Sequence, residues 1–176
     1  MKLKKFEGNP ILSPTDANDW ESLVTCNPGV IYDDGTFYML YRAAGNDAEH
    51  VIRLGLATSK DGFHFERVSD MPAFGPSEDG PDSGCVEDPR IVKYDTEYYI
   101  TYAYRPYSPG QYWNFGHDEI LLPECGSDAP MALRKNLGNT GLAVTTDFRE
   151  FKRLGRLTSP VLDDRDVILF PEKVQG

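Results

Sequence analysis

The stretch GTFYMLY at Gly35–Tyr41 returns in pattern as TEYYITY at Thr96–Tyr102. A second pair, Gly55–Asp61 and Gly141–Asp147, opens on Gly-Leu-Ala and closes on aspartate in both copies. Motifs that recur in the same order along a chain are the signature of a repeat architecture, in which each repeat is one supersecondary unit. The chain is therefore predicted to be built from structural repeats.

Short segments rich in valine, isoleucine, tyrosine and phenylalanine alternate with Asp-Gly turns such as Asp34-Gly35 and Asp61-Gly62, a pattern typical of successive hairpins. No segment has the pattern of an amphipathic helix. Strands are predicted at residues 29–32, 36–42, 53–59, 63–69, 90–94, 98–104, 140–146 and 151–157. Four strands in each repeat indicate an all-β fold of the β-propeller type, in which the first strand of each blade lines the central axis.

A proline opens each repeat, in the dipeptides Asn27-Pro28, Asp88-Pro89 and Phe170-Pro171. Proline at the first residue of a strand costs no ladder hydrogen bond, and it biases the residue before it toward an extended backbone. We therefore expect Asn27 and Asp88 to be extended and to point into the axial cavity. Glu87 is expected to face the other way, because side chains alternate along a strand. Only the second repeat offers a carboxylate before its proline.

The predicted organisation is one partial propeller domain over residues 1–176. Blade 1 covers about residues 24–70, blade 2 about 86–160, and a third blade begins at about 165–176. Blade 2 carries a long insertion at 106–139, which could cover a sugar site or a subunit contact, or serve as surface padding. Two blades and the start of a third cannot close a ring. We expect the chain to be part of a longer protein, and the alternative is that another chain supplies the missing blades.

Composition limits the partners. A chain of 176 residues with 40% hydrophobic and 12% aromatic content is typical of a folded domain. The net charge of -10 argues against nucleic acid and anionic membranes, and favours a neutral substrate. The basic N-terminus has no apolar region behind it, and no apolar run is long enough to span a bilayer, so a cytoplasmic location is expected. The three cysteines and three histidines lack the spacing of a disulfide framework or a metal site, and we predict no metal.

Several motifs together resemble the mannoside phosphorylases of glycoside hydrolase family 130. The specific ones are the Glu-Asp-Pro-Arg-Ile block at Glu87–Ile91 and the block from Asp163 to Lys173, which reads DDRDVILFPEK. Asn27–Val30, Tyr41–Ala43 and Ser59–Gly62 add to the match, which runs nearly end to end. Members of the family are five-bladed β-propellers, so the resemblance implies that this chain corresponds to the N-terminal half of one.

The resemblance implies inverting phosphorolysis of a β-mannoside, such as mannosyl-glucose or a manno-oligosaccharide, to α-mannose 1-phosphate and a free acceptor sugar. Asp88 then corresponds to the catalytic acid, which passes its proton to the glycosidic oxygen through a substrate hydroxyl. Arg165 corresponds to a phosphate-binding arginine, a role that suits the planar fork of a guanidinium. Asn27 falls where the family contacts the mannosyl unit, and Arg42 and Arg53 are further candidates for sugar or acceptor contacts. No cofactor is implied, and inorganic phosphate is the co-substrate.

Other interpretations stay open at this point. Asp88 could merely cap a turn before proline, and Arg165, with acidic residues on both sides, could be a solvated ion-pair residue. The chain could also belong to a β-mannoside hydrolase of the same fold, or be an inactive fragment or sugar-binding module. The partners expected are a small carbohydrate and phosphate, and a homo-oligomer is compatible with the sequence.

Overall fold

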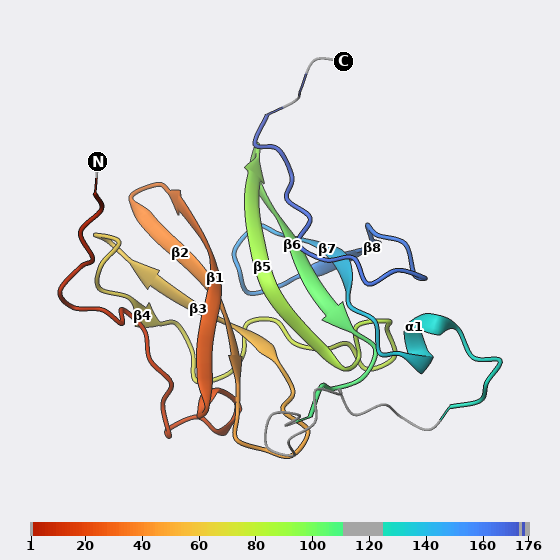
Figure 1. Cartoon of the computed structure of the whole chain (residues 1–176). Helices are drawn as coiled ribbons and strands as arrows, with labels where there is room; N and C mark the ends of the chain where they lie inside the picture. Colours follow the sequence, from red (N-terminus) through yellow and green to blue (C-terminus); the bar gives the residue numbers. More distant parts are fainter. Residues whose placement is uncertain (1, 111–124, 173, 175–176) are drawn as a thin grey trace.

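The computed structural model describes residues 2–110, 125–172 and 174, and these residues form two four-stranded antiparallel sheets (Figure 1). In each sheet the strands are neighbours in chain order. The first sheet contains β1 (Val24–Asp33), β2 (Thr36–Ala44), β3 (Arg53–Ser59) and β4 (Glu66–Arg67). The second contains β5 (Cys85–Tyr94), β6 (Glu97–Arg105), β7 (Asn139–Thr145) and β8 (Lys152–Arg156). Two short helical turns, η1 (Asp19–Glu21) and α1 (Met131–Arg134), complete the described structure.

All eight predicted strands are confirmed, and the bounds of three of them, β1, β5 and β4, differ by several residues from the prediction. The inner strands β1 and β5 begin five residues earlier than predicted, at Val24 and Cys85, because pairing continues on the N-terminal side of each proline. The predicted strand at 63–69 is reduced to β4, Glu66–Arg67. Its first residues are held differently, since the backbone N–H groups of Phe63 and His64 donate to the carboxylate of Asp61 instead of to a ladder.

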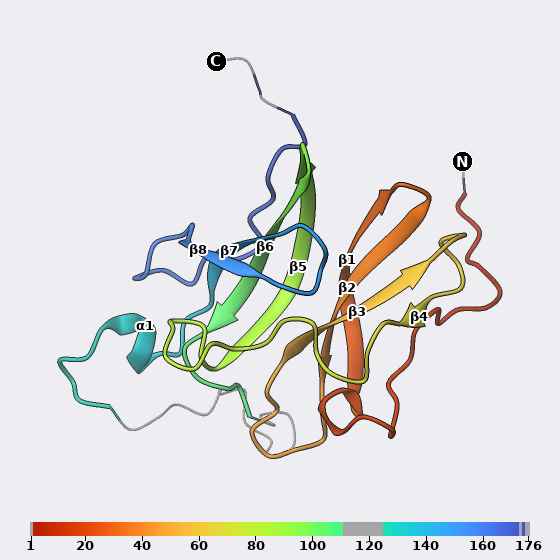
Figure 2. The ribbon, with the colours of Figure 1, turned by 180° about the vertical axis from the view of Figure 1, so that it is seen from behind.

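The two sheets stand side by side as successive blades. Their inner strands β1 and β5 are neighbours, as both ribbon views show (Figures 1 and 2). Apolar side chains from both blades meet between them, in the two clusters Leu54, Phe74, Val86, Tyr102, Tyr104, Ala143 and Leu40, Leu56, Tyr98, Ile100, Phe148. Burial of this shared apolar surface holds blade against blade. The described residues therefore have the all-β, propeller-type architecture predicted from the repeats.

The repeats also share a buried polar network. In blade 1 the hydroxyl of Tyr41 donates to Glu21, which also accepts from Arg67. The corresponding hydroxyl in blade 2, that of Tyr102, donates to Asp82, which also accepts from Arg153. Burial and the adjacent carboxylate raise the pKa of both tyrosines above the ordinary value. Each blade therefore uses one fully paired carboxylate to tie its outer strand to the strand that carries the tyrosine.

A close contact between glycine and tyrosine supports this network in each blade and leads to a prediction. A Cβ atom at Gly141 would lie 2.5 Å from Cζ of Tyr102, which is buried and hydrogen-bonded. We expect Gly141→Ala to lower the free energy of unfolding by about 1–3 kcal/mol, because the ring has no space to retreat. Chemical denaturation measures the change. Gly75→Ala is the control, since its nearest neighbours would lie 3.8 Å away at Arg53, and a loss as large as that of Gly141→Ala would contradict the prediction.

The rest of the described chain adds little regular structure. The insertion predicted at 106–139 contains α1, which the sequence pattern did not predict, while residues 111–124 lie outside the described residues. Beyond β8 the described residues contain no strand, so the beginning of a third blade stays a prediction. Lys173, the last residue of the second specific block, is also outside the described residues. No helix in the described part of the chain is long and apolar enough to cross a membrane.

Candidate active site

The inner strands carry matching bulges at the two X-Pro positions. Register shifts occur between Cys26 and Gly29 in β1 and between Glu87 and Arg90 in β5. Asn27 and Asp88 have φ angles of 43° and 54°, so both are in the left-handed region. The expectation of an extended backbone was therefore wrong. A bulge places two residues opposite one, and asparagine and aspartate tolerate the left-handed conformation better than most side chains, which outweighs the local bias from proline.

The two bulges face each other across the blade interface. The amide nitrogen Nδ2 of Asn27 donates a hydrogen bond of 3.0 Å to Oδ1 of Asp88. The backbones approach so closely that a Cβ atom at Gly29 would lie 2.6 Å from the carbonyl oxygen of Pro89. Gly29 is therefore required where β1 meets β5. Equivalent positions of two repeats, 61 residues apart in the chain, thus meet at one point of the inner face.

Glu87 lies at the centre of a cluster of charges around Asp88. Its carboxylate is within 2.8 Å of Nη1 of Arg42, and within 3.8 Å of both Arg105 and Arg165. The same Nη1 of Arg42 lies 3.2 Å from Oδ1 of Asp88. The prediction that Glu87 faces away from Asp88 was therefore wrong, because the bulge breaks the alternation of side chains on which it rested. We name Arg42, Glu87, Asp88, Arg105 and Arg165 the acid–arginine cluster.

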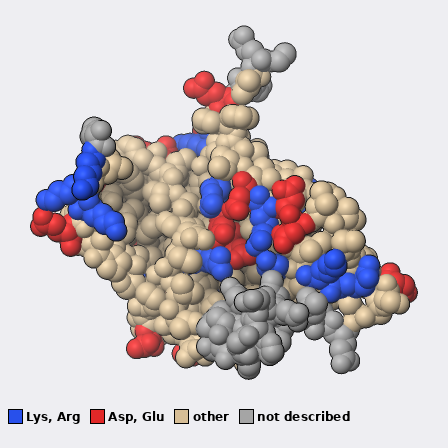
Figure 3. All heavy atoms as spheres, in the orientation of Figure 1, with Lys and Arg blue, Asp and Glu red and all other residues tan. Residues whose placement is uncertain are grey.

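Burial and charge in the cluster are unequal. Glu87 is only 4% exposed, whereas the side chain of Asp88 is 18% exposed and that of Arg165 is 36% exposed. Burial opposes the charge of Arg42, but the carboxylates of Glu87 and Asp88 outweigh it and raise the pKa of the guanidinium above its ordinary value. Figure 3 shows acidic and basic side chains crowded together on this face, over β5 and β6. Glu87 is thus the buried anchor, and Arg42, Asp88 and Arg165 are the members that reach solvent.

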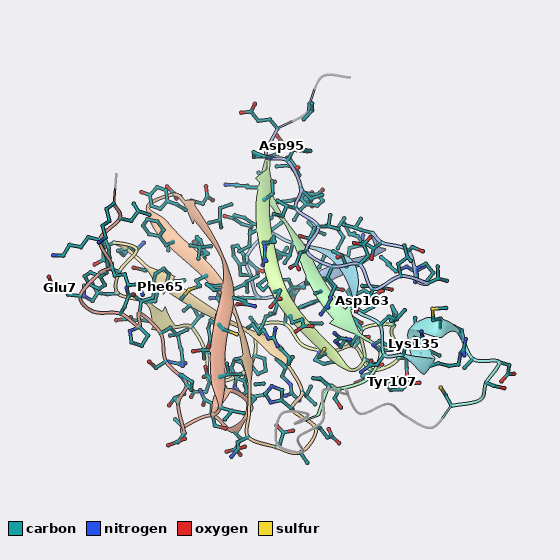
Figure 4. All side chains as sticks on the ribbon, viewed as in Figure 1. Glu7, Phe65, Asp95, Tyr107, Lys135 and Asp163 are labelled. Carbon is teal, nitrogen blue, oxygen red and sulfur yellow. The ribbon has the colours of Figure 1, made fainter. Side chains whose placement is uncertain are left out.

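Arg165 is held at one end and open at the other. Its Nε lies 3.0 Å from Oδ1 of Asp163, which is labelled in Figure 4, while Nη1 approaches Glu87 no closer than 3.8 Å. The distance to Glu87 is within ion-pair range but beyond a hydrogen bond. The terminal amino groups of Arg165 therefore make no hydrogen bond to any residue that the structure describes. They are available to an anion.

Not every predicted residue joins the cluster. Asn27, Arg42, Asp88 and Arg165 are brought together, although they come from both blades and from the segment after β8. Arg53 instead donates to the carbonyl oxygen of Val51 and lines a separate pocket of about 500 Å³ with residues that include Trp20 and Asp47. Four of the five candidate residues are therefore joined by hydrogen bonds and ion pairs. The fifth, Arg53, takes no part in these contacts.

Sequence reasoning missed two members of the cluster, Glu87 and Arg105. The sequence did contain a signal for Glu87. In the comparison of the repeats Glu87 is equivalent to Cys26, so blade 2 carries two consecutive acidic residues where blade 1 has none. Arg105 ends the strand β6, directly opposite Cys85 in the ladder, and its guanidinium also donates to the carbonyl oxygen of Asn136. Nothing in the local pattern distinguishes it from a solvated strand-end arginine.

The two blades and the acid–arginine cluster define a propeller-type protein with a candidate site formed by residues of β5, β2, β6 and the segment after β8. A family model described as beta-1,4-mannooligosaccharide phosphorylase matches residues 2–113, and the chain belongs to that family, glycoside hydrolase family 130. The match contains Asn27, Arg42 and Asp88, while Arg165 lies beyond it.

Comparison with individual proteins agrees with this assignment. A 1,2-beta-oligomannan phosphorylase of Thermoanaerobacter sp. (strain X514) is 32% identical over 186 residues, which cover 100% of this chain and 51% of that protein. The chain thus spans about half the length of this relative. The beta-1,2-mannobiose phosphorylase of Listeria innocua has the same fold, with a TM-score of 0.66 at 18% identity over 97% of this chain and 55% of that one.

A third comparison concerns hydrolases. A structure solved in work on family members that are glycoside hydrolases targeting beta-1,2 mannosidic linkages in Candida mannan is 26% identical to this chain. Its TM-score is 0.59, and the match covers 85% of this chain and 40% of that one. Both phosphorylases and hydrolases are therefore among the proteins that this chain resembles.

Proposed function

We propose that the protein catalyses inverting phosphorolysis of a β-mannoside, giving α-mannose 1-phosphate and a free acceptor sugar. The family model and the relative that is 32% identical are both named for phosphorylases of β-mannosides, which supports this substrate class. The names differ in linkage, β-1,4 for the family description and β-1,2 for both phosphorylases. A panel of β-1,2-mannobiose, β-1,4-mannobiose and mannosyl-glucose would identify the preferred acceptor side.

One observation carries the proposal: Asp88 sits where two blades meet, and Arg165 reaches the same cluster from a distant segment. In the proposed reaction a phosphate oxygen attacks the anomeric carbon, the bond to the acceptor oxygen breaks, and that oxygen takes a proton originating from Asp88. Phosphate is already an anionic nucleophile, so a single acid and a cationic pocket suffice. An inverting hydrolase would need a separate base to activate water.

The proposal assigns the remaining groups as follows. Arg165 holds the phosphate through its open amino groups, because a guanidinium can grip two phosphate oxygens at once. Asn27 and Arg42, which both contact Asp88, orient this carboxylate and face the mannosyl unit. Arg53 would contact a more distant part of the substrate, because its pocket is separate from the cluster. Inorganic phosphate is the co-substrate, and no cofactor or metal takes part in this scheme.

Replacing Arg165 tests the assignment. We expect Arg165→Ala in the full-length protein to raise the KM for phosphate by about tenfold to a hundredfold, the range of a lost charge-assisted hydrogen bond. The KM for the mannoside should change little. Formation of mannose 1-phosphate is the measurement, and Arg149→Ala, at an exposed arginine of blade 2, is the matched control. An unchanged phosphate KM in Arg165→Ala would remove Arg165 from this role.

A second candidate function is hydrolysis, which the likeness to family hydrolases favours. The two functions differ in their need for phosphate. Release of mannose at the same rate with and without phosphate, and no mannose 1-phosphate, would establish the hydrolase and end the first proposal. A cytoplasmic location and a homo-oligomer stay predictions from the sequence, to be tested by fractionation and by size measurement.

A further inference from the structure

The repeats differ at two buried positions on one face of the blade. When the repeated motifs are superposed, Leu40 of β2 is equivalent to Thr101 of β6. In the same way, Leu54 of β3 is equivalent to Thr140 of β7. All four side chains are at most 2% exposed. The same framework position is therefore apolar in blade 1 and carries a hydroxyl in blade 2.

In blade 1 these leucines form the contact with the next blade. Leu54 packs in a cluster with Val86 and Tyr102, and Leu40 packs in a cluster with Tyr98 and Ile100. Such apolar contacts bury area without prescribing which atom lies against which. Leucine at these positions therefore serves blade packing alone.

In blade 2 the threonines bind a stretch of backbone, residues 157–167, which we name the strap. Oγ1 of Thr101 donates a hydrogen bond of 2.7 Å to the carbonyl oxygen of Val167. Oγ1 of Thr140 donates one of 3.4 Å to the carbonyl oxygen of Asp164. The strap is further held by Asn139, whose Nδ2 donates to the carbonyl oxygens of Ser159 and Leu162. Asn139 is 3% exposed, so these are buried donors with specific acceptors.

The strap carries Arg165 between the two carbonyl groups that the threonines bind. One acceptor belongs to the residue before Arg165, and the other to the second residue after it. The side chain of Arg165 then runs over Gly138, where a Cβ atom would lie 2.4 Å from its Cδ. The backbone N–H of Asp164 donates to the carbonyl oxygen of Gly138, so the strap is also tied down beneath the arginine. The backbone on both sides of Arg165 is thus held by hydrogen bonds, and the side chain lies against Gly138 on its way toward Glu87.

We propose that Thr101, Thr140 and Asn139 are positioning residues that fix the register of the strap and thereby aim the Arg165 guanidinium at bound phosphate. This inference rests on the proposed function, in which Arg165 binds phosphate. An apolar face would let the strap slide or tilt at little cost, whereas hydrogen bonds from buried donors hold particular carbonyl groups. A small displacement of a side chain that binds the reacting group lowers the rate of catalysis strongly, so the register of the strap affects the reaction.

The test uses substitutions that keep side-chain volume and remove only the hydroxyl. We expect Thr101→Val and Thr140→Val, in the full-length protein, each to raise the KM for phosphate about fivefold to tenfold, and the double variant more. The KM for the mannoside should stay within about twofold. Thr140→Ser, which keeps the hydroxyl, should restore the phosphate KM. The matched control is Thr145→Val on the same strand, whose hydroxyl serves the turn at Asp147 instead of the strap.

The outcomes separate the two proposals. If Arg165→Ala raises the phosphate KM but neither threonine variant does, the positioning role is overturned and the proposed function stands. If both KM values rise together in the threonine variants, the threonines are merely structural, and the inference is equally overturned. If Arg165→Ala leaves the phosphate KM unchanged while mannose 1-phosphate still forms, Arg165 does not bind phosphate and the inference falls with that role. The proposed function itself fails only if no mannose 1-phosphate forms. Thr101 and Thr140 lie on different strands, so one variant decides the matter if the other does not fold.

Discussion

Replacing Asp88 with asparagine is expected to lower kcat for mannoside phosphorolysis by a factor of about a hundred to ten thousand, the contribution of a general acid. The substitution should leave the backbone conformation at this position unchanged. Asp88 has a φ of 54°, a conformation that asparagine adopts readily, and the equivalent residue of blade 1 is in fact Asn27, with a φ of 43°. The side-chain oxygen of the amide can still accept hydrogen bonds from Asn27 and Arg42, so the variant loses the transferable proton and the negative charge of the carboxyl group.

Two measurements make the Asp88 result specific. Thermal unfolding of Asp88→Asn should lie close to that of the parent, and the KM for the mannoside should be similar, because the contacts around the site are retained. Asp33→Asn is the control, since Asp33 also ends a network of polar contacts, with Lys93 and Tyr98, but belongs to no part of the acid–arginine cluster. Phosphorolysis by Asp88→Asn at the parental rate would mean that another group supplies the proton.

Replacing Glu87 with alanine is expected to lower the free energy of unfolding by about 3–5 kcal/mol, the cost of breaking a buried ion pair from one side. Glu87 is 4% exposed and is approached by three guanidinium groups. Removing the carboxylate leaves Arg42, whose side chain is 23% exposed, with Asp88 as its remaining ion-pair partner among the described residues. Chemical denaturation of the parent and the variant gives the difference directly.

The control for this prediction is Glu97→Ala in the same sheet. Glu97 is exposed and accepts a hydrogen bond from Tyr99, so its loss should change stability by no more than about 0.5 kcal/mol. If Glu87→Ala were as mild as Glu97→Ala, the cluster would not be held together by its buried carboxylate. Glu87 would then contribute little to stability, and Asp88 would be the carboxylate that stabilises the charge of Arg42.

Sequence reasoning could single out Asp88 as a candidate because the residues next to it distinguish it, and its catalytic role stays a prediction. Asp88 stands beside a proline in a repeated motif, and the comparison with Asn27 shows which of the two positions can supply a proton. The predicted direction of Glu87 failed because the alternation rule assumes an unbroken strand, whereas β5 has a bulge at this residue. Arg53 was predicted together with Arg42 to make sugar or acceptor contacts, and the fold places it in another pocket.

The amino-acid sequence by itself determined the repeats, the strands and their grouping into blades. These follow from side-chain alternation and turn residues, which act over a few positions along the chain. The tertiary structure alone decided that Asn27 contacts Asp88, that Glu87 unites three arginines, and that threonines in blade 2 hold the strap of Arg165. These contacts join residues as much as 78 positions apart, through bulges and packing between blades, and no local pattern encodes how two such surfaces meet.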